Sequence, residues 1–418
     1  MSNTLTTSEL AFLDIYEQYV DEASFLWLMH TIAVDQPHYG VTELRNLEKR
    51  IESQLNGLMG NLDIAWSICE QAFENDAEAG EVFTAAILAF RSHDQAKIQF
   101  VVENAMTSEE GYQGLLYALT WLPGSLVHDW VKRFFTSKDL NHKKLAIEVC
   151  NIRRENPADY LVSIFQREDC LENIELYIAS LKITGELKRF DLIEDVLKAI
   201  DHDDESVRFW AIRSAIFIGD KSQVTKLEPY ISEPSELQYE AIQIAFRVLP
   251  VATAREWVSK LVNDPDKMRT LIIITGVIGD PFAIDWLLQK MNETEFARVA
   301  AEAFCLITGT NLVAKDMTSP APEDADTLPS EDADDDNVKM HDDENLPWPN
   351  VIKVQNYWNS IKANYTAGQR YLLGNHIGLL FLKNNIDSAL QRQRHAMAIE
   401  ISLIDKNEKL FNTRGKVN

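Results

Sequence analysis

Residues 203–220 read DDESVRFWAIRSAIFIGD, with an acidic start, an apolar run and the closing pair Gly219–Asp220. Ala211 and Ala215 lie eight and four residues before Gly219, so they share one face of a helix, because residues four apart on a helix are neighbours. Glycine suits the left-handed residue that ends a helix, and aspartate suits the cap that begins the next one. The stretch therefore predicts one helix, a tight turn and a second helix, rather than a catalytic loop.

The same spacing recurs along the chain at intervals of roughly 30 residues, which is typical of a helical repeat. After each turn, apolar residues follow at plus five, eight, nine and twelve and form one face of the second helix. No single helix pair can bury that face alone, so the units must stack. The sequence therefore predicts an all-α fold, an α-solenoid of antiparallel helix pairs. The turn positions are His93, Leu122, Ile152, Gly185, Gly219, Leu249, Gly279 and Gly309, with weaker fits at 152 and 185.

Several residues of this pattern are assigned to the structure of the repeat. Gly219, Gly279 and Gly309 are predicted to end first helices, and Asp220 and Asp280 are each predicted to cap the helix that follows. Arg208 and Arg298 each lie eleven residues before a turn position, and we expect them to bond an acid or a carbonyl of a neighbouring unit rather than a ligand. The full set is Arg208, Gly219, Asp220, Gly279, Asp280, Arg298 and Gly309.

The quoted stretch and RTLIIITGVIGDPFAIDWLL (269–288) resemble HEAT repeats of the short bacterial type. A narrower resemblance covers most of the chain, to a family of bacterial HEAT-repeat proteins encoded in type VI secretion gene clusters. That resemblance implies an association with secretion or with the secreted effectors, and it supplies no catalytic residues. It is carried by DEASFLWLMHTIAVDQPHYG (21–40), EVFTAAILAF (81–90), ARVAAEAFCLITG (297–309), ENLPWPN (344–350), GQRYLLG (368–374) and LFNTRG (410–415).

Four segments follow from these patterns. Residues 1–76 lack the repeat spacing and are predicted to form an N-terminal helical cap, and residues 77–315 hold the HEAT-like repeats. Residues 316–346 are strongly acidic, contain little to bury and are predicted to be a disordered insertion. Residues 347–418 are predicted to be C-terminal helices that complete the solenoid.

The acidic segment is expected to interrupt a single repeat. If Pro349 takes the turn position, then Val354, Tyr357, Trp358 and Ile361 occupy the second-helix face. Residues 350–363 should therefore pack beside residues 296–308. The acids lack the spacing of a calcium-binding loop, so a solvated loop is the favoured interpretation, with imitation of DNA or capture of a basic partner as alternatives.

The charge and the cysteines limit the possible partners. The formal net charge is −25, from 65 acidic and 40 basic residues, which argues against nucleic acid and anionic membranes. It permits a basic protein partner, although solubility alone also explains it. The four cysteines, Cys69, Cys150, Cys170 and Cys305, form no CxxC pair and are expected to be reduced. With no secretory signal and no uninterrupted apolar span, the protein is expected to be soluble and cytoplasmic.

The sequence contains no HExxH, GxSxG, CxxC or Walker motif of known catalytic or nucleotide-binding sites. We therefore expect a protein that is not an enzyme, with no metal and no cofactor. Trp286 lies at plus seven, off the predicted core face, and is the candidate partner-binding residue, with packing against the next repeat as the alternative. The basic group Arg392, Arg394 and His395 is expected to hold the last helix or the acidic segment.

Two functions remain open from the sequence. The first is a non-catalytic protein-binding scaffold, a type VI secretion accessory protein that serves as an effector or spike adaptor or as an immunity protein. Its partner would be a protein encoded nearby, such as an effector, a spike or a PAAR-type protein. The second is an enzyme of the lyase type on a HEAT-like scaffold, which would need a chromophore pocket.

Overall fold

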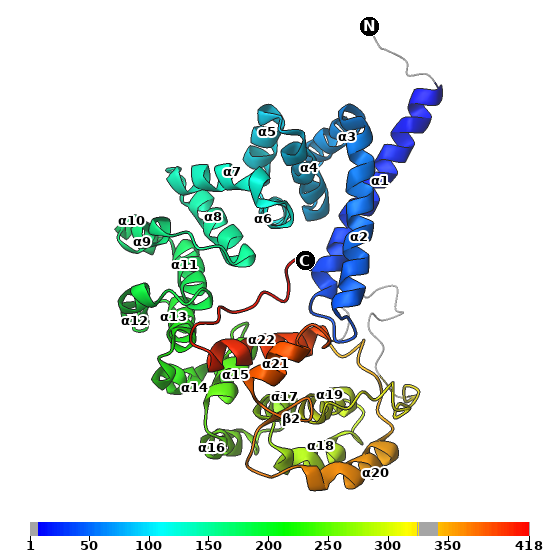
Figure 1. The fold of residues 1–418 in the computed structure, drawn as a ribbon, viewed down its shortest axis with the longest axis vertical. Coiled ribbons are helices and arrows are strands. Elements are labelled where there is room, and N and C mark those ends of the chain that lie inside the picture. Colours follow the sequence, from blue (N-terminus) through cyan, green and yellow to red (C-terminus); the bar gives the residue numbers. More distant parts are fainter. Residues whose placement is uncertain (1–6, 324, 326–341, 418) are drawn as a thin grey trace. The chain divides into compact units, whose positions relative to one another are not determined.

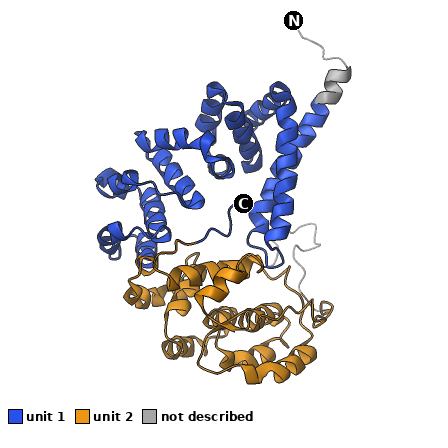
Figure 2. Ribbon diagram, in the orientation of Figure 1, with its two compact units in different colours: residues 1–214, 411–418 blue, residues 215–410 orange. Residues whose placement is uncertain are grey.

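The computed structural model describes residues 7–323, 325 and 342–417 (Figure 1). These residues form helices joined by short turns, with one two-stranded hairpin, so the predicted all-α class is confirmed. The chain divides into two compact units, which are residues 1–214 with 411–418 (unit 1) and residues 215–410 (unit 2), as Figure 2 shows. The border falls inside the predicted 77–315 repeats, and residues 411–418 belong with unit 1 rather than with the helices that precede them.

Unit 1 begins with the long pair α1 and α2, which pack against each other. From α4 onward it contains a first helix in each predicted repeat, namely α4, α6, α8, α11 and α13, and a shorter element after most of them. Its elements are α1 (Thr7–Ala33), α2 (Val41–Leu58), η1 (Met59–Asn61), α3 (Leu62–Glu74), α4 (Ala79–Ser92), α5 (Gln95–Ala105), α6 (Glu109–Trp121), α7 (Gly124–Thr136), α8 (Leu140–Arg153), α9 (Asp159–Phe165), α10 (Glu168–Glu172), α11 (Ile174–Glu186), η2 (Phe190–Leu192), α12 (Ile193–Ala199) and α13 (Glu205–Ile218), the last crossing the border.

The first helices of unit 1 lie side by side because small residues let their backbones approach. A Cβ atom added to Gly114 in α6 would lie 2.3 Å from the Ala79 carbonyl oxygen at the start of α4. A Cβ atom added to Gly185 in α11 would lie 2.6 Å from Cα of Ser214 in α13. The Ser214 hydroxyl donates across the same contact to the Leu181 carbonyl at 2.7 Å. Close packing between consecutive first helices thus depends on the smallest side chains.

Unit 2 repeats the pattern of paired helices and ends with a hairpin and two further helices. Its elements are η3 (Lys221–Leu227), α14 (Glu228–Ser232), α15 (Gln238–Val248), α16 (Val251–Leu261), η4 (Pro265–Lys267), α17 (Met268–Ile278), η5 (Pro281–Ala283), α18 (Ile284–Lys290), α19 (Ala297–Thr308), α20 (Val351–Ile361), η6 (Lys362–Asn364), β1 (Tyr371–Leu372), β2 (Asn375–His376), α21 (Leu379–Asn385) and α22 (Gln391–Ile404). The antiparallel hairpin pairs Tyr371 with His376, within the segment that the sequence predicts as C-terminal helices.

Most residues of the predicted second-helix faces are buried, whereas Trp130, Val258, Tyr357 and Ile361 are partly buried and Phe190, at plus five from Gly185, is exposed. This confirms the spacing of plus five, eight, nine and twelve as a core pattern. The buried residues at these positions are Ile98, Val101, Val102, Val127, Val131, Phe134, Val224, Leu227, Ile231, Ala254, Trp257, Leu261, Ile284, Leu287, Leu288, Met291, Val354 and Trp358. Two of these second helices begin with 3₁₀ geometry, at η3 before α14 and at η5 before α18.

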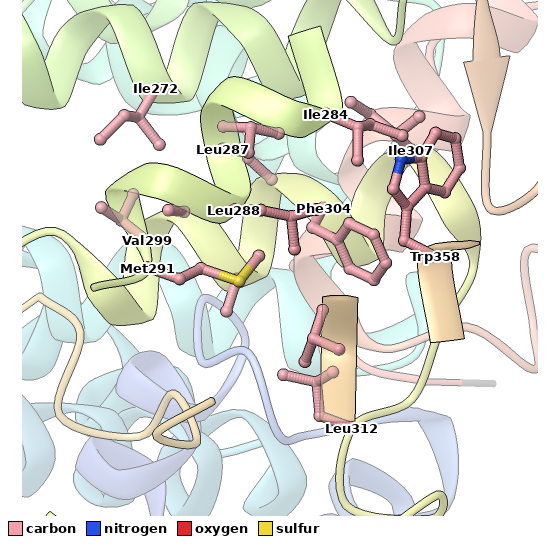
Figure 3. Close-up of a cluster of buried hydrophobic side chains, with 14 of the residues drawn as sticks. Ile272, Ile284, Leu287, Leu288, Met291, Val299, Phe304, Ile307, Leu312 and Trp358 are labelled. Carbon is pink, nitrogen blue, oxygen red and sulfur yellow. The ribbon is translucent and has the colours of Figure 1, made fainter. Parts of the chain in front are cut away.

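The core of unit 2 shows where the acidic segment interrupts the chain. Figure 3 shows Phe304 of α19 and Trp358 of α20 in one buried cluster, with the ring centroids 6.4 Å apart. The Trp358 indole nitrogen donates to Asp285 of α18 at 3.1 Å. The predicted packing of residues 350–363 beside 296–308 is therefore confirmed.

Both described ends of the acidic segment are attached to unit 2. Thr318 and Pro349 form an antiparallel bridge, and the Asn350 amide donates to the Met317 carbonyl at 2.8 Å. Asp343 is buried and forms an ion pair with Arg269 at 2.6 Å. Of the segment 316–346 predicted to be disordered, residues 324 and 326–341 lie outside the described residues, whereas Met317, Asp343 and Leu346 at its ends are buried.

Gly279 and Gly309 end α17 and α19 in the left-handed conformation, with φ of 72° and 68°. Gly219 follows α13 with φ of 135°. The Asp220 and Asp280 carboxylates accept hydrogen bonds from the amides of Ser222 and Phe282. These are the turn and capping roles that the repeat pattern predicts for the glycines and aspartates.

Candidate functional site

A groove of about 540 Å³ crosses the first helices α6, α8 and α11 of unit 1. Each helix contributes polar or charged side chains that point away from its apolar, buried face. The side chains central to the groove are Tyr112, Tyr117, Lys144, Glu148, Glu175 and Lys182. Lateral packing of these helices therefore brings residues 36 and 31 positions apart into one row.

Hydrogen bonds link this row from one helix to the next. The Tyr112 hydroxyl of α6 donates to Glu148 of α8, and the Lys144 ammonium of α8 donates to Glu175 of α11. Lys144 Nζ also lies 4.7 Å from the centroid of the Tyr112 ring. The row of Tyr112, Lys144, Glu148 and Glu175, called here the groove ladder, is thus connected across three helices.

The row continues towards α13 through a cation–π contact. Lys182 Nζ lies 3.9 Å from the centroid of the Trp210 ring, and the Arg213 guanidinium lies 5.0 Å from the same ring on α13. The attraction between a cation and the face of an aromatic ring is favourable in water and becomes stronger when the pair is partly desolvated. Lys182, Trp210 and Arg213 thus extend the row beyond the groove ladder with one aromatic and two positively charged groups.

Burial sets the electrostatics of the groove ladder. It raises the pKa of the Glu148 carboxyl, although the hydrogen bond from Tyr112 acts in the opposite direction. Burial, with the nearby charges of Glu148 and Glu175, raises the pKa of Tyr112, so the phenol remains a hydrogen-bond donor at neutral pH. The polar groups of neighbouring helices thus satisfy one another's hydrogen bonds, and this stabilises a polar surface along the groove.

A second feature of unit 1 is the irregular segment 411–417, which crosses its helices. The Asn412 side chain donates to the Ile152 carbonyl at the end of α8 at 2.8 Å. Lys416 Nζ donates to Glu52 of α2 at 2.7 Å. Burial alone would raise the pKa of Glu52, but hydrogen bonds and charges from Lys416 and Arg91 outweigh it and lower that pKa to about 2. Ile152 also lines the groove, so the segment begins at the groove's edge.

The candidate residues named from the sequence lie elsewhere. Trp286 of α18 is partly buried and packs against the core cluster of unit 2. Arg208 donates to the carbonyls of His202 and Asp203 in the preceding turn, both at 2.7 Å. Arg298 forms an ion pair with Glu344 at 3.4 Å and lies 4.7 Å from the Trp348 ring centroid. None of these residues lines the groove in the part of the chain that the structure describes.

The basic group near the C-terminus contacts the acidic segment. Arg392 donates to Glu302 of α19 at 3.0 Å and to the Asp342 carbonyl at 3.0 Å. Arg394 is buried and donates to the Ile386 carbonyl at 3.1 Å. These contacts are those of a group that holds α22 and one end of the acidic segment.

The groove does not follow from the predicted pattern, because the candidate partner-binding residue Trp286 lies on a second helix. The groove instead lies on first helices, where polar residues interrupt the apolar pattern. Lys144 and Glu148 are four residues apart on one helix face. Polar residues recurring on that face in consecutive repeats were the available signal.

Two further properties of the described residues bear on function. Among residues 7–323, 325 and 342–417, no three His, Cys, Asp or Glu side chains gather as ligands for one metal ion. Over the same ranges, every helix is too short or too polar to cross a membrane. Comparison of the chain with protein-family models, with curated proteins and with solved structures finds no match in any of the three.

Proposed function

We propose that the chain is a non-catalytic protein-binding scaffold, built as an α-solenoid of HEAT-like antiparallel helix pairs with an N-terminal helical cap. Helix pairs with tight capped turns, buried second-helix faces and first helices in lateral contact all support this architecture. Solenoids of this kind present a long surface made from equivalent positions of successive repeats. Such a surface suits the recognition of a macromolecule.

The groove ladder carries the proposal. It joins α6, α8 and α11 through paired charges and aromatic rings, and it lines a groove of about 540 Å³ with polar groups. A partner's charged side chains can replace individual links of the ladder, because those links are themselves hydrogen bonds and ion pairs. The net charge of −25 favours a basic partner through electrostatic attraction.

The resemblance to proteins of type VI secretion gene clusters supports an accessory role in secretion, in the cytoplasm. The partner would then be an effector, a spike or a PAAR-type protein encoded nearby. An adaptor would bind both its cargo and the spike. An immunity protein would form a stable one-to-one complex with a toxin and protect the cell from it.

The test is co-purification of the chain with the product of a neighbouring gene, followed by charge reversal in the groove. Glu175→Lys inverts an exposed carboxylate of the groove ladder in the first turn of α11. Glu194→Lys makes the same change in the first turn of α12, away from the groove, and is the matched control. We expect Glu175→Lys to weaken binding of a basic partner by roughly tenfold or more, and Glu194→Lys to leave it unchanged.

Equal affinity for both variants would exclude the groove as the partner surface. Turnover of a small molecule by the purified chain, with no protein partner, would overturn the scaffold proposal itself. Protection from a co-expressed toxin would favour immunity, and binding to a spike component would favour an adaptor.

A further inference from the structure

Segment 411–417 lies on unit 1 without helix or strand, and it bends at residues 413–415, where Asn412 Oδ1 accepts from the amides of Arg414 and Gly415 at 3.0 and 3.1 Å. Arg414 Nε donates to Asp35 after α1 at 2.7 Å, and Lys416 Nζ donates to Glu52 of α2 at 2.7 Å. The Val417 amide donates to Glu48 of α2 at 2.7 Å. Three carboxylates thus receive two cationic side chains and one backbone amide. This is the chemistry of peptide recognition by charge and by main chain.

The carboxylates are held in place by unit 1 itself. The Trp121 indole nitrogen donates to Glu52 at 2.8 Å, and Arg91 donates to the other oxygen of the same carboxylate at 2.7 Å. Glu48 is buried and lies 3.1 Å from His30 Nε2. Because His30, Arg91 and Trp121 belong to α1, α4 and α6, Glu48 and Glu52 of α2 are oriented without help from segment 411–417.

Lys416 occupies a site that combines a carboxylate with an aromatic face. Its Nζ lies 4.6 Å from the centroid of the Trp121 ring, the same indole that orients Glu52. A ring face beside a fixed carboxylate selects an ammonium group, because both contribute negative potential at one point. We call Asp35, Glu48, Glu52 and Trp121 the lysine-binding surface.

The segment that covers this surface is held by one exposed ion pair, that of Arg414, and by the part-buried polar contacts of Lys416 and of the Val417 amide. The Arg414 side chain is 56 % exposed in its ion pair, and Phe411 is an exposed aromatic residue. The buried side chain among these residues is the small Thr413. Exposed ion pairs contribute on the order of 0–1 kcal/mol each, so the segment can be displaced by a chain that makes the same contacts.

We propose that the lysine-binding surface is a docking site for a segment of a protein partner that carries an arginine and a lysine two residues apart. Residues 411–417 then occupy the site in cis until such a segment displaces them. The inference rests on the proposed function, since it gives the scaffold a second contact surface next to the groove. It also predicts that the partner segment is basic, because residues 411–417 place an arginine and a lysine in the same site.

The test titrates a fluorescent peptide with the sequence LFNTRGKV, taken from residues 410–417, against the full chain and its variants. In Arg414→Gln/Lys416→Gln the covering segment loses its two cationic contacts. We expect this variant to bind the peptide at least about tenfold more tightly than the unaltered chain, because a tethered competitor acts at an effective concentration in the millimolar range. Adding Glu52→Gln should remove the gain. The exposed Lys406→Ala is the matched control and should bind as weakly as the unaltered chain.

Equal binding by the unaltered chain and the double variant would overturn the inference, as would tight binding that persists after Glu52→Gln. Melting temperature with and without peptide is the second measurement, since a ligand of the folded state raises it. It keeps the test decisive if the double variant is less stable. Peptide binding unaffected by Glu175→Lys would separate this site from the groove, so either proposal can fail without the other.

Discussion

Gly279 and Gly309 each serve two purposes that their φ angles alone do not reveal. Both end a helix in the left-handed region, and both lie directly beneath the segment 368–374. A Cβ atom at Gly279 would lie 2.3 Å from the Tyr371 carbonyl oxygen, and one at Gly309 would lie 2.5 Å from that of Leu373. The Tyr371 amide donates to the Gly279 carbonyl at 2.8 Å. These two glycines therefore admit a crossing backbone as well as a turn.

We expect Gly279→Ala to lower the free energy of unfolding by more than the cost of a left-handed alanine, which is about 1–2 kcal/mol. The additional loss comes from the clash with Tyr371. Gly368→Ala is the matched control, because Gly368 also has a positive φ, of 86°, but has open space around its Cα. Denaturant unfolding measures both variants, and equal losses would show that the crossing backbone yields at no cost.

The cysteine thiols are predicted to react slowly in the folded protein. Cys69 and Cys150 are buried and Cys305 is partly buried, all as free thiols, and burial raises the pKa of each to about 12. At pH 8 the reactive thiolate is therefore scarce. A thiol reagent should modify these three within minutes in denaturant and much more slowly in the native protein. Rapid native modification of any of them would contradict the buried placement.

At the level of helices, a buried charge network attaches α22 to the rest of unit 2. Glu400 of α22 is 3 % exposed and forms ion pairs with Arg247 of α15 and with Arg370 of the segment before the hairpin. Arg370 also donates to the carbonyls of Arg247 and Ile278, at 2.7 and 3.1 Å. One carboxylate thus compensates two guanidinium groups, and the three side chains come from three separate parts of the chain.

We expect Glu400→Gln to destabilise the protein by roughly 3–5 kcal/mol, because it leaves two arginines without their buried counter-charge. Glu408→Gln is the control, since Glu408 forms an exposed ion pair with Lys383 and should change stability by no more than about 0.5 kcal/mol. Denaturant midpoints for the two variants decide the matter. Similar midpoints would mean that water reaches the network and screens it.

In unit 1 as a whole, the attachment of segment 411–417 to the helices should depend on pH, because Lys416 binds the carboxylate of Glu52. Its pKa is lowered to about 2 from the ordinary 4.5, and the partners Lys416 and Arg91 stay charged over that range. A group whose pKa is lower in the folded state stabilises fully above its unfolded pKa and loses that contribution as pH falls through its folded pKa.

The difference in unfolding free energy between the unaltered chain and Glu52→Gln should therefore be constant above about pH 5 and shrink from there towards pH 2. Unfolding curves at several pH values measure it. A difference that does not change between pH 5 and pH 2 would show that Glu52 titrates normally and that Lys416 does not hold it.

The repeat was predictable because its signals are local. Helical spacing, a glycine that ends a helix and an aspartate that caps the next all act within about a dozen residues. Gly279 and Asp280 could be assigned from their neighbours alone, and Trp358 could be placed on α20 by the same spacing across the acidic segment. The short 3₁₀ starts at η3 and η5 were missed because the same apolar spacing is compatible with either kind of turn.

The contacts on which the two proposals rest join residues far apart in the chain, and local patterns do not encode such pairs. Arg414 meets Asp35 across 379 residues, and Lys416 meets Glu52 across 364. The groove ladder needs three helices in lateral register before Tyr112, Glu148 and Glu175 become neighbours. Amino-acid order thus determined the helices, their caps and their buried faces, since each depends on nearby residues. Packing decided which polar faces meet and where segment 411–417 lies, since those energies exist only once distant helices have assembled.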